Sequence, residues 1–230
     1  CSFTVKINEL IPQAPTGTCP ANITVNTEPV SCAKVVGSSI APAYTDNCPT
    51  NILTYNLNIV GATTVSLSGN SGSIITPVSF NRGLSTVTFT ITDNAGGTST
   101  CTFTVTVQDK TAPTVSCPGN ITVNATSVSS CNASVSNSAS DYTNGIINRN
   151  DLAHTSFDNC ATTTQLNNNT NTTWVLSGAT VGSGTGNGSL LGSTWVPTNL
   201  SIGVTTVTYT VRDGALGNNT ATCAFTITVQ

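Results

Sequence analysis

The segment from Thr86 to Asp109, TVTFTITDNAGGTSTCTFTVTVQD, constrains the fold more than any other part of the 230-residue chain. Its apolar residues fall on every second position on both sides of a glycine-containing turn: Val87, Phe89, Ile91, then Cys101, Phe103, Val105 and Val107. This alternation predicts two half-buried strands, joined by a turn at Asp93 to Gly97, with one core face and one solvent face. We therefore expect a β-hairpin.

The same hairpin pattern returns from Thr206 to Gln230 as TVTYTVRDGALGNNTATCAFTITVQ. Other motifs also occur twice: CPANITV begins at Cys19 and CPGNITV at Cys117, and Asp-Asn-Cys occurs at residues 46–48 and 158–160. The repetition predicts two domains, residues 10–108 and 109–230, and each is large enough to bury a core.

About seven short strands per unit, with regular turn signals, are typical of an immunoglobulin-like sandwich. No window shows useful helical periodicity. We predict an all-β fold of tandem immunoglobulin-like β-sandwich domains stapled by disulfides, joined by short proline-containing linkers at residues 10–15 and 108–114.

The first nine residues repeat only the second strand of the hairpin, with Cys1, Phe3, Val5 and Ile7 in phase. A lone strand does not fold by itself, and leaving Phe3, Val5 and Ile7 in water would forgo about 1.5–3 kcal/mol each. We interpret residues 1–9 as the final strand of a preceding or neighbouring repeat. The alternatives are the amino-terminal cysteine of a lipoprotein and a strand donated to another subunit.

The composition excludes nucleic acids and anionic membranes as binding partners. Only 7% of residues are charged, the net charge is −3, and the six Lys and Arg residues are scattered singly. The chain therefore lacks the basic footprint of nucleic-acid binding and a polybasic patch for anionic membranes. Its apolar runs are a few residues long, so we expect no membrane span.

Nine cysteines, one histidine and no Cys-x-x-Cys pair favour disulfides over zinc, and hence an extracellular or cell-surface setting. In each domain we prefer pairing of the first cysteine with the second and the third with the fourth. Four cysteines allow three connectivities, and pairing of the first with the fourth and the second with the third stays open. The expected disulfide cysteines are Cys19, Cys32, Cys48, Cys101, Cys117, Cys131, Cys160 and Cys223.

The motifs follow a fixed order: APTVSCPGNITVN, a second cysteine, Asp-Asn-Cys, GVTTVTYTV-x-D and CAFTITV. This succession resembles the hyalin repeat family, and the resemblance covers nearly the whole chain twice. It implies an immunoglobulin-like sandwich from extracellular, adhesive or structural proteins, with no catalytic residues. The second copy departs from the first because Cys131 to Cys160 spans 29 positions against 16 for Cys32 to Cys48. We expect its extra residues to form Asn-, Thr- and Gly-rich loops, including Asn167–Thr173 and Gly182–Gly188.

Few residues suggest site chemistry. His154 has no accompanying nucleophile motif, so we predict no enzyme. Trp174 and Trp195 suit either core packing or a carbohydrate platform. Asn-x-Ser/Thr sequons, the glycosylation acceptors of secreted proteins, occur at Asn22, Asn120, Asn124, Asn132, Asn168, Asn171, Asn187, Asn199 and Asn218, and we expect those at Asn168 and Asn171 to be the most exposed.

Acidic residues near turns raise a calcium hypothesis because loop carbonyls could add oxygen ligands. Against it, the chain has no EF-hand cluster, and Asp is an ordinary turn former. We therefore expect no cofactor, with calcium kept as an alternative. The acids concerned are Asp46, Asp93, Asp109, Asp158 and Asp213.

The sequence as a whole predicts an extracellular structural or adhesive repeat module of a tandem-repeat surface protein or filament. We expect its partners to be itself or neighbouring repeats, and also cell-surface glycans or proteins. The competing prediction is a ligand- or carbohydrate-binding module that uses the enlarged loops of the second domain.

Overall fold

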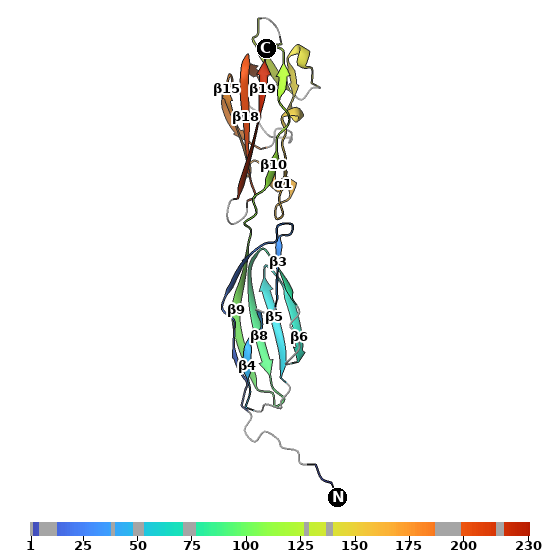
Figure 1. The fold of residues 1–230 in the computed structure, drawn as a ribbon, viewed down its shortest axis with the longest axis vertical. Helices are drawn as coiled ribbons and strands as arrows, with labels where there is room; N and C mark the ends of the chain where they lie inside the picture. Colours follow the sequence, from blue (N-terminus) through green and yellow to red (C-terminus); the bar gives the residue numbers. More distant parts are fainter. Residues whose placement is uncertain are drawn as a thin grey trace. The chain divides into compact units, whose positions relative to one another are not determined.

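The computed structural model describes residues 2–4, 13–37, 40–47, 53–70, 77–126, 129–136, 140–186, 199–214 and 219–230. Contacts between Cα atoms divide the chain into two units, Cys1–Asp109 and Lys110–Gln230. Both are almost entirely β-structure, as the alternating sequence predicts (Figure 1).

The first unit is a sandwich built on a five-stranded sheet of order β2-β9-β8-β5-β6, in which β2 runs parallel to β9 and the other pairs are antiparallel. The short pairs β1-β4 and β3-β7 complete it. The described strands are β1 (Thr16–Thr18), β2 (Ile23–Asn26), β3 (Ala33–Val36), β4 (Ala43–Thr45), β5 (Thr54–Gly61), β6 (Val65–Asn70), β7 (Val78–Asn81), β8 (Gly83–Thr92) and β9 (Thr98–Gln108).

The second unit repeats this sheet as β11-β19-β18-β15-β16, with β11 parallel to β19. The pair β10-β14 and the sheet β13-β12-β17 complete the sandwich. The strands are β10 (Thr114–Ser116), β11 (Ile121–Val123), β12 (Asn132–Ser136), β13 (Ile146–Asn148), β14 (Thr155–Phe157), β15 (Thr172–Gly178), β16 (Gly182–Thr185), β17 (Asn199–Ser201), β18 (Gly203–Arg212) and β19 (Thr220–Val229).

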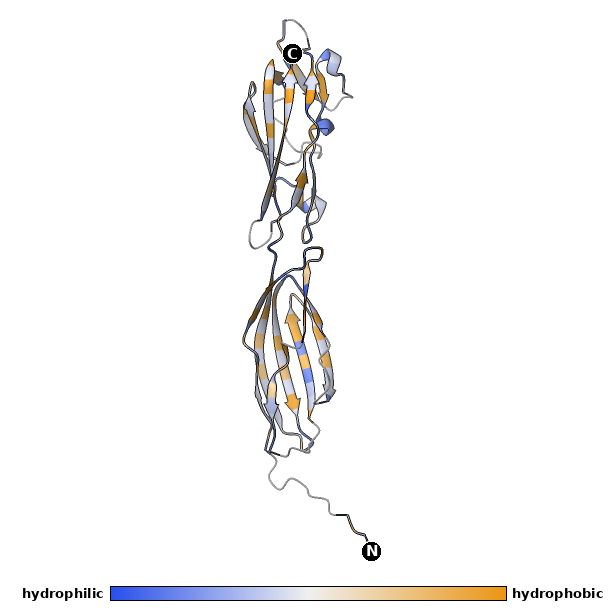
Figure 2. Cartoon of the chain, viewed as in Figure 1, coloured by the Kyte–Doolittle hydropathy of each residue, from blue (hydrophilic) through white to orange (hydrophobic). Residues whose placement is uncertain are grey.

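Both predicted hairpins are confirmed as β8-β9 and β18-β19. Each unit has its own core, because the alternate residues of these strands point inward and pack against the shorter strands. Figure 2 shows hydrophobic and hydrophilic residues alternating along them. The hairpin residues buried in the first core are Val87, Phe89, Ile91, Phe103, Val105 and Val107.

The extra residues of the second unit are more ordered than the predicted loops. They include the 3-10 helices η2 (Tyr142–Asn144) and η3 (Arg149–Leu152), and the short helix α1 (Thr163–Leu166). Within the two expected loops, Thr172 and Thr173 begin β15, and Gly182–Thr185 is β16. The predicted number of strands per unit, about seven, is also too small, because the described part of the first unit contains nine.

Candidate functional site

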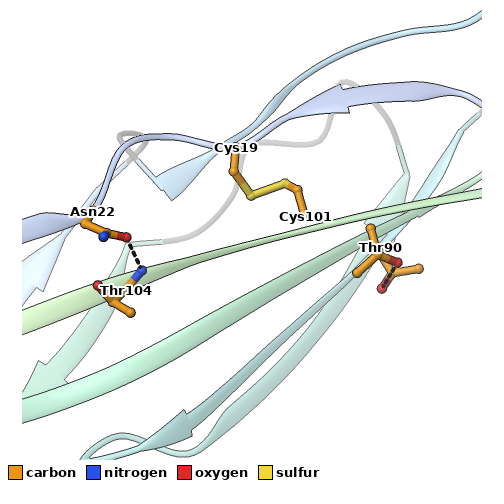
Figure 3. Close-up of a disulfide and its surroundings, with 6 residues drawn as sticks. Cys19, Asn22, Thr90, Cys101 and Thr104 are labelled. Carbon is orange, nitrogen blue, oxygen red and sulfur yellow. Dashed lines mark hydrogen bonds between the residues drawn. A yellow bond between two sulfur atoms is a disulfide. The ribbon is translucent and has the colours of Figure 1, made fainter.

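A disulfide joins the parallel strand pair at the edge of each main sheet. Cys19 bonds Cys101, with a Cα–Cα distance of 5.6 Å (Figure 3). Cys117 bonds Cys223, with a Cα–Cα distance of 5.7 Å. The register explains both pairs. Ile23 lies opposite Val105, and each is four residues beyond its cysteine, so the two strands bring the cysteines side by side.

The preferred pairing of first with second and third with fourth cysteine is therefore wrong. Cys19 bonds Cys101 instead of Cys32, and Cys117 bonds Cys223 instead of Cys131. The physical reason is the parallel pairing of a domain's early strand with its last strand, which no local pattern reveals. The alternative paired the first cysteine with the fourth and the second with the third. Its first part is confirmed in both units, but its second part is wrong in the second unit, because Cys131 is a free thiol.

The remaining cysteines do not have the same disulfide state in the two units. Cys131 is an exposed free thiol, so its predicted disulfide is wrong. It also has a positive φ of 51° at the start of β12. Cys32 and Cys160 are disulfide-bonded, whereas Cys1 and Cys48 lie outside the described residues.

The first two sequon asparagines bridge the same strands as the disulfides. The Asn22 side chain accepts a hydrogen bond from the Thr104 N–H at 2.9 Å (Figure 3). The Asn120 side chain accepts one from the Thr226 N–H, also at 2.9 Å. These sequons therefore have a structural role in each sheet. Of the two sequons expected to be most exposed, Asn168 is exposed, but Asn171 is half-buried and donates from Nδ2 to the Gln165 carbonyl.

Two of the acids named by the calcium hypothesis come together within the second unit. One carboxylate oxygen of Asp158 and one of Asp213 lie within 4.8 Å of each other, and both residues are buried. Asp109 directly follows β9, Asp158 follows β14 and Asp213 follows β18.

Hydrogen bonds fix two of these carboxylates. Asp158 Oδ1 accepts from the N–H groups of Cys160 and Ala161, at 2.7 and 2.8 Å. Asp213 Oδ2 accepts from Asn219 Nδ2 at 2.6 Å. The Asp213 N–H donates to the Asn219 carbonyl, so the β18-β19 turn holds this side chain in place.

The equivalent turn of the first unit holds Asp93 in a similar way. Its Oδ1 accepts from the N–H groups of Ala95 and Gly97, both at 2.8 Å, and its own N–H donates to the Gly97 carbonyl. Asp46 precedes Asn47 and Cys48 as Asp158 precedes Asn159 and Cys160. The two units thus place an acid at the same two points of the fold.

His154 is part of the core of the second unit. It is 2% exposed, and its ring meets the edge of Tyr209 with the centroids 4.7 Å apart. Tyr209 in turn donates its hydroxyl to the Leu152 carbonyl. Burial lowers the pKa of His154 below its usual value of 6.5. The side chain is closed to a substrate, which agrees with the prediction that it is not a catalytic base.

Trp174 packs in the core and cannot serve as an exposed sugar platform. It is 1% exposed and lies over Gly184 of the neighbouring strand, where an added Cβ would meet the ring at 2.3 Å. The first unit contains the same arrangement, with Tyr55 over Gly69. Trp195, the other candidate platform residue, lies outside the described residues.

A family model matches part of the second unit. The HYR domain family model matches residues 155–229, which lie in the second unit. No curated protein matches the chain. The disulfides fit an extracellular or secreted protein, and no helix among the described residues is long and apolar enough to cross a membrane.

Several solved structures of tandem extracellular domains are similar to the chain. Human CDH23 EC21-23 is 15% identical with a TM-score of 0.41, and the match covers 95% of this chain and 70% of that one. Mouse Cadherin-23 EC22-24 is 13% identical with a TM-score of 0.34, covering 95% and 67%. Drosophila N-cadherin EC1-3 is 12% identical with a TM-score of 0.30, covering 95% and 68%.

Proposed function

We propose that the chain is a non-catalytic, extracellular adhesive and spacer module made of two tandem hyalin-type sandwiches, residues 10–108 and 109–230. In this proposal residues 1–9 are the final strand of a preceding or neighbouring repeat. The partners are other copies of the module or neighbouring repeats in a surface array or filament.

The observation that carries this proposal is the repetition of one stapled unit. The sheet order β2-β9-β8-β5-β6 recurs as β11-β19-β18-β15-β16, and a disulfide joins the parallel edge pair in both. Successive units with the same connectivity are typical of spacer and adhesion arrays, in which each domain is one building block. Disulfides suit such a block because it works outside the reducing cytosol.

An exposed apolar group in the second sandwich supports self-association. Val181, Ile202 and Val204 are each more than half exposed. The Ser201 N–H donates to the Thr180 hydroxyl at 2.9 Å, which brings the turn containing Val181 next to the turn containing Ile202. Neighbouring exposed apolar side chains favour contact with another protein surface.

Self-association can be tested by sedimentation velocity and negative-stain microscopy of the purified chain in non-reducing buffer. We expect concentration-dependent oligomers or end-to-end filaments, and we expect Val204→Asp to weaken them. Val30→Asp is the matched control, because Val30 is 90% exposed in the first sandwich and lies outside the group. A strictly monomeric chain at high concentration would reject the self-adhesive part of the proposal.

The carbohydrate-binding alternative has less support. Burial of Trp174 removes one of its two aromatic candidates, and Trp195 is the remaining one. Binding of the folded chain to a glycan array, lost in Trp195→Ala, would favour this alternative over the spacer proposal.

A further inference from the structure

We propose that the end of the second sandwich that carries Cys131 docks against a second copy of the chain, and that a disulfide at this residue joins the two copies. This docking rests on the self-association proposed above and gives it a surface and a bond. Cys131 is an exposed free thiol directly before β12. The other cysteines of its unit, Cys117, Cys160 and Cys223, are already disulfide-bonded. A disulfide at Cys131 therefore needs a cysteine from outside the unit.

The first sandwich supplies an independent observation at the same point of the fold. The Cys131 carbonyl accepts a hydrogen bond from the N–H of Ile202, which joins β17 to β18. The Cys32 carbonyl accepts one from the N–H of Arg82, which joins β7 to β8. Cys32 is disulfide-bonded, so this point carries a disulfide in one unit and a free thiol in the other. A cysteine left over in a secreted protein indicates pairing between molecules.

The thiol lies beside the exposed apolar group of Val181, Ile202 and Val204. The Ile202 N–H donates to the Cys131 carbonyl at 3.2 Å, so the cysteine is adjacent to one member of this group. All three apolar side chains are more than half exposed. Together the four residues form one patch, which we call the Cys131 surface.

The fold does not require apolar residues at this surface. In both sandwiches the last residue of β7 or β17 donates its N–H to a threonine hydroxyl, at 2.7 Å in the first sandwich and 2.9 Å in the second. The residues that directly follow these two groups are Thr64 and Arg82 in the first sandwich, and Val181 and Ile202 in the second. Two polar positions are thus apolar in the sandwich whose thiol is free. Covering such side chains with another protein surface gains free energy.

A second copy of the chain is the partner that fits the Cys131 surface. Among the residues that the structure describes, Cys131 is the one free thiol, so the matching thiol in another copy is its own Cys131. An interface about a twofold axis brings the same patch of two copies together. It places the two sulfur atoms in contact and packs the two apolar groups against each other.

Bond formation needs an oxidant, and a low-molecular-weight disulfide such as oxidised glutathione supplies it. The Cys131 thiolate of one copy attacks glutathione disulfide, which forms a mixed disulfide and releases one glutathione thiolate. The Cys131 thiolate of the second copy then attacks the Cys131 sulfur of the mixed disulfide and releases the other glutathione thiolate. Two protein thiols are oxidised to one disulfide, and one glutathione disulfide is reduced to two thiols, which take up the two protons.

The experiment equilibrates the 230-residue chain, at micromolar concentration, with millimolar reduced and oxidised glutathione. Thiols are then blocked with N-ethylmaleimide, intact-mass spectrometry quantifies the dimer and the glutathione adduct, and peptide mapping identifies the linked cysteines. An exposed thiol without a docking surface ends mostly as the glutathione adduct, because glutathione is far more concentrated than the protein. Docking raises the effective concentration of the second thiol, so we expect a dimer linked through Cys131 to be the main oxidised product.

The matched control is Cys131→Ser/Val175→Cys, which moves the thiol to β15 of the same sandwich. Val175 is about as exposed as Ile202 and lies outside the Cys131 surface. The ratio of dimer to glutathione adduct should be roughly tenfold lower in this control than in the wild type. Val204→Asp and Val181→Asp keep the thiol but place like charges across the interface, so each should lower the ratio about fivefold. They lie in different elements, so either one serves if the other fails to fold.

The proposal is overturned if the wild type and the Val175→Cys control give the same ratio, or if neither aspartate variant lowers it. It is also overturned if the mapped bond joins a different cysteine. Sedimentation of Cys131→Ser in the same buffer separates these results from the proposed function. Non-covalent association of this variant would support the adhesive function without the bond, whereas a strictly monomeric variant together with no wild-type dimer would reject both.

Discussion

The disulfide between Cys117 and Cys223 gives the sharpest prediction for stability. It joins two residues that are 106 positions apart in the sequence, and so it closes a loop that takes up most of the 121-residue second unit. The chain-entropy relation for such a loop gives about 4.8 kcal/mol of stabilisation at 25 °C, by restricting the unfolded chain. With an unfolding entropy of about 2.1 cal/mol/K per residue, this loss corresponds to a fall in Tm of roughly 15–20 °C for the second sandwich.

The assay is differential scanning calorimetry of Cys117→Ser/Cys223→Ser in non-reducing buffer. Cys131→Ser is the control, because it makes the same chemical change at an exposed free thiol of the same sandwich and should alter stability by about 0.5 kcal/mol or less. A double variant that melts within about 5 °C of the wild type would refute the reasoning from loop length. So would a control that loses as much stability as the double variant.

Three further predictions concern side chains in the second sandwich. Burial lowers the pKa of His154 below 6.5, so the unfolded state binds the proton more readily than the folded state does. The free energy of unfolding should therefore be constant above pH 6.5 and decrease as the pH is lowered from 6.5, by at most about 1.4 kcal/mol per pH unit. His154→Gln should remove this pH dependence in urea titrations. Gly184→Ala should lower the free energy of unfolding by about 1–3 kcal/mol, because the new Cβ forces Trp174 aside. Gly119→Ala is the control, since nothing lies within 4 Å of its new Cβ, and it should change Tm little. Equal effects of the two variants would contradict the contact with the Trp174 ring. Asn120→Ala should lower the free energy of unfolding, measured by chemical denaturation, by about 0.5–1.5 kcal/mol, because it removes the hydrogen bond from the Thr226 N–H of β19. An unchanged denaturation midpoint would count against that hydrogen bond.

The hairpins could be predicted from sequence because a period of two is a local property. Val87, Phe89 and Ile91 alternate with threonines, and all three are buried in β8. The disulfide pairing could not be predicted in this way, since it depends on which strand lies beside β9. One signal was available: Cys19 precedes Ile23 by four residues, as Cys101 precedes Val105.

The elements missed in the second sandwich are too short for a periodic signal. Helix α1 spans only Thr163–Leu166. It begins with a capping box, in which the Thr162 side chain accepts from the Gln165 N–H and the Gln165 side chain accepts from the Thr162 N–H. A Thr-x-x-Gln pattern was therefore the available indication.

Two acids of the second unit could be named from the sequence, but their proximity could not. Asp158 and Asp213 follow different strands and lie 55 positions apart in the sequence. Only the folded unit brings their carboxylate oxygens within 4.8 Å. Long-range convergence of loops is invisible to any pattern read along the chain.

The position of the edge disulfides also decides how the module responds to tension. A force applied on both sides of the first unit passes from Cys19 to Cys101 through the sulfur atoms, so the intervening chain carries no load. The loop spans 82 of the 109 residues, which leaves about 27 free to straighten. At about 3.5 Å per residue these reach roughly 95 Å, against about 380 Å for the reduced unit. A chain of such units with intact disulfides therefore extends to about a quarter of the contour length of the reduced chain and then becomes inextensible.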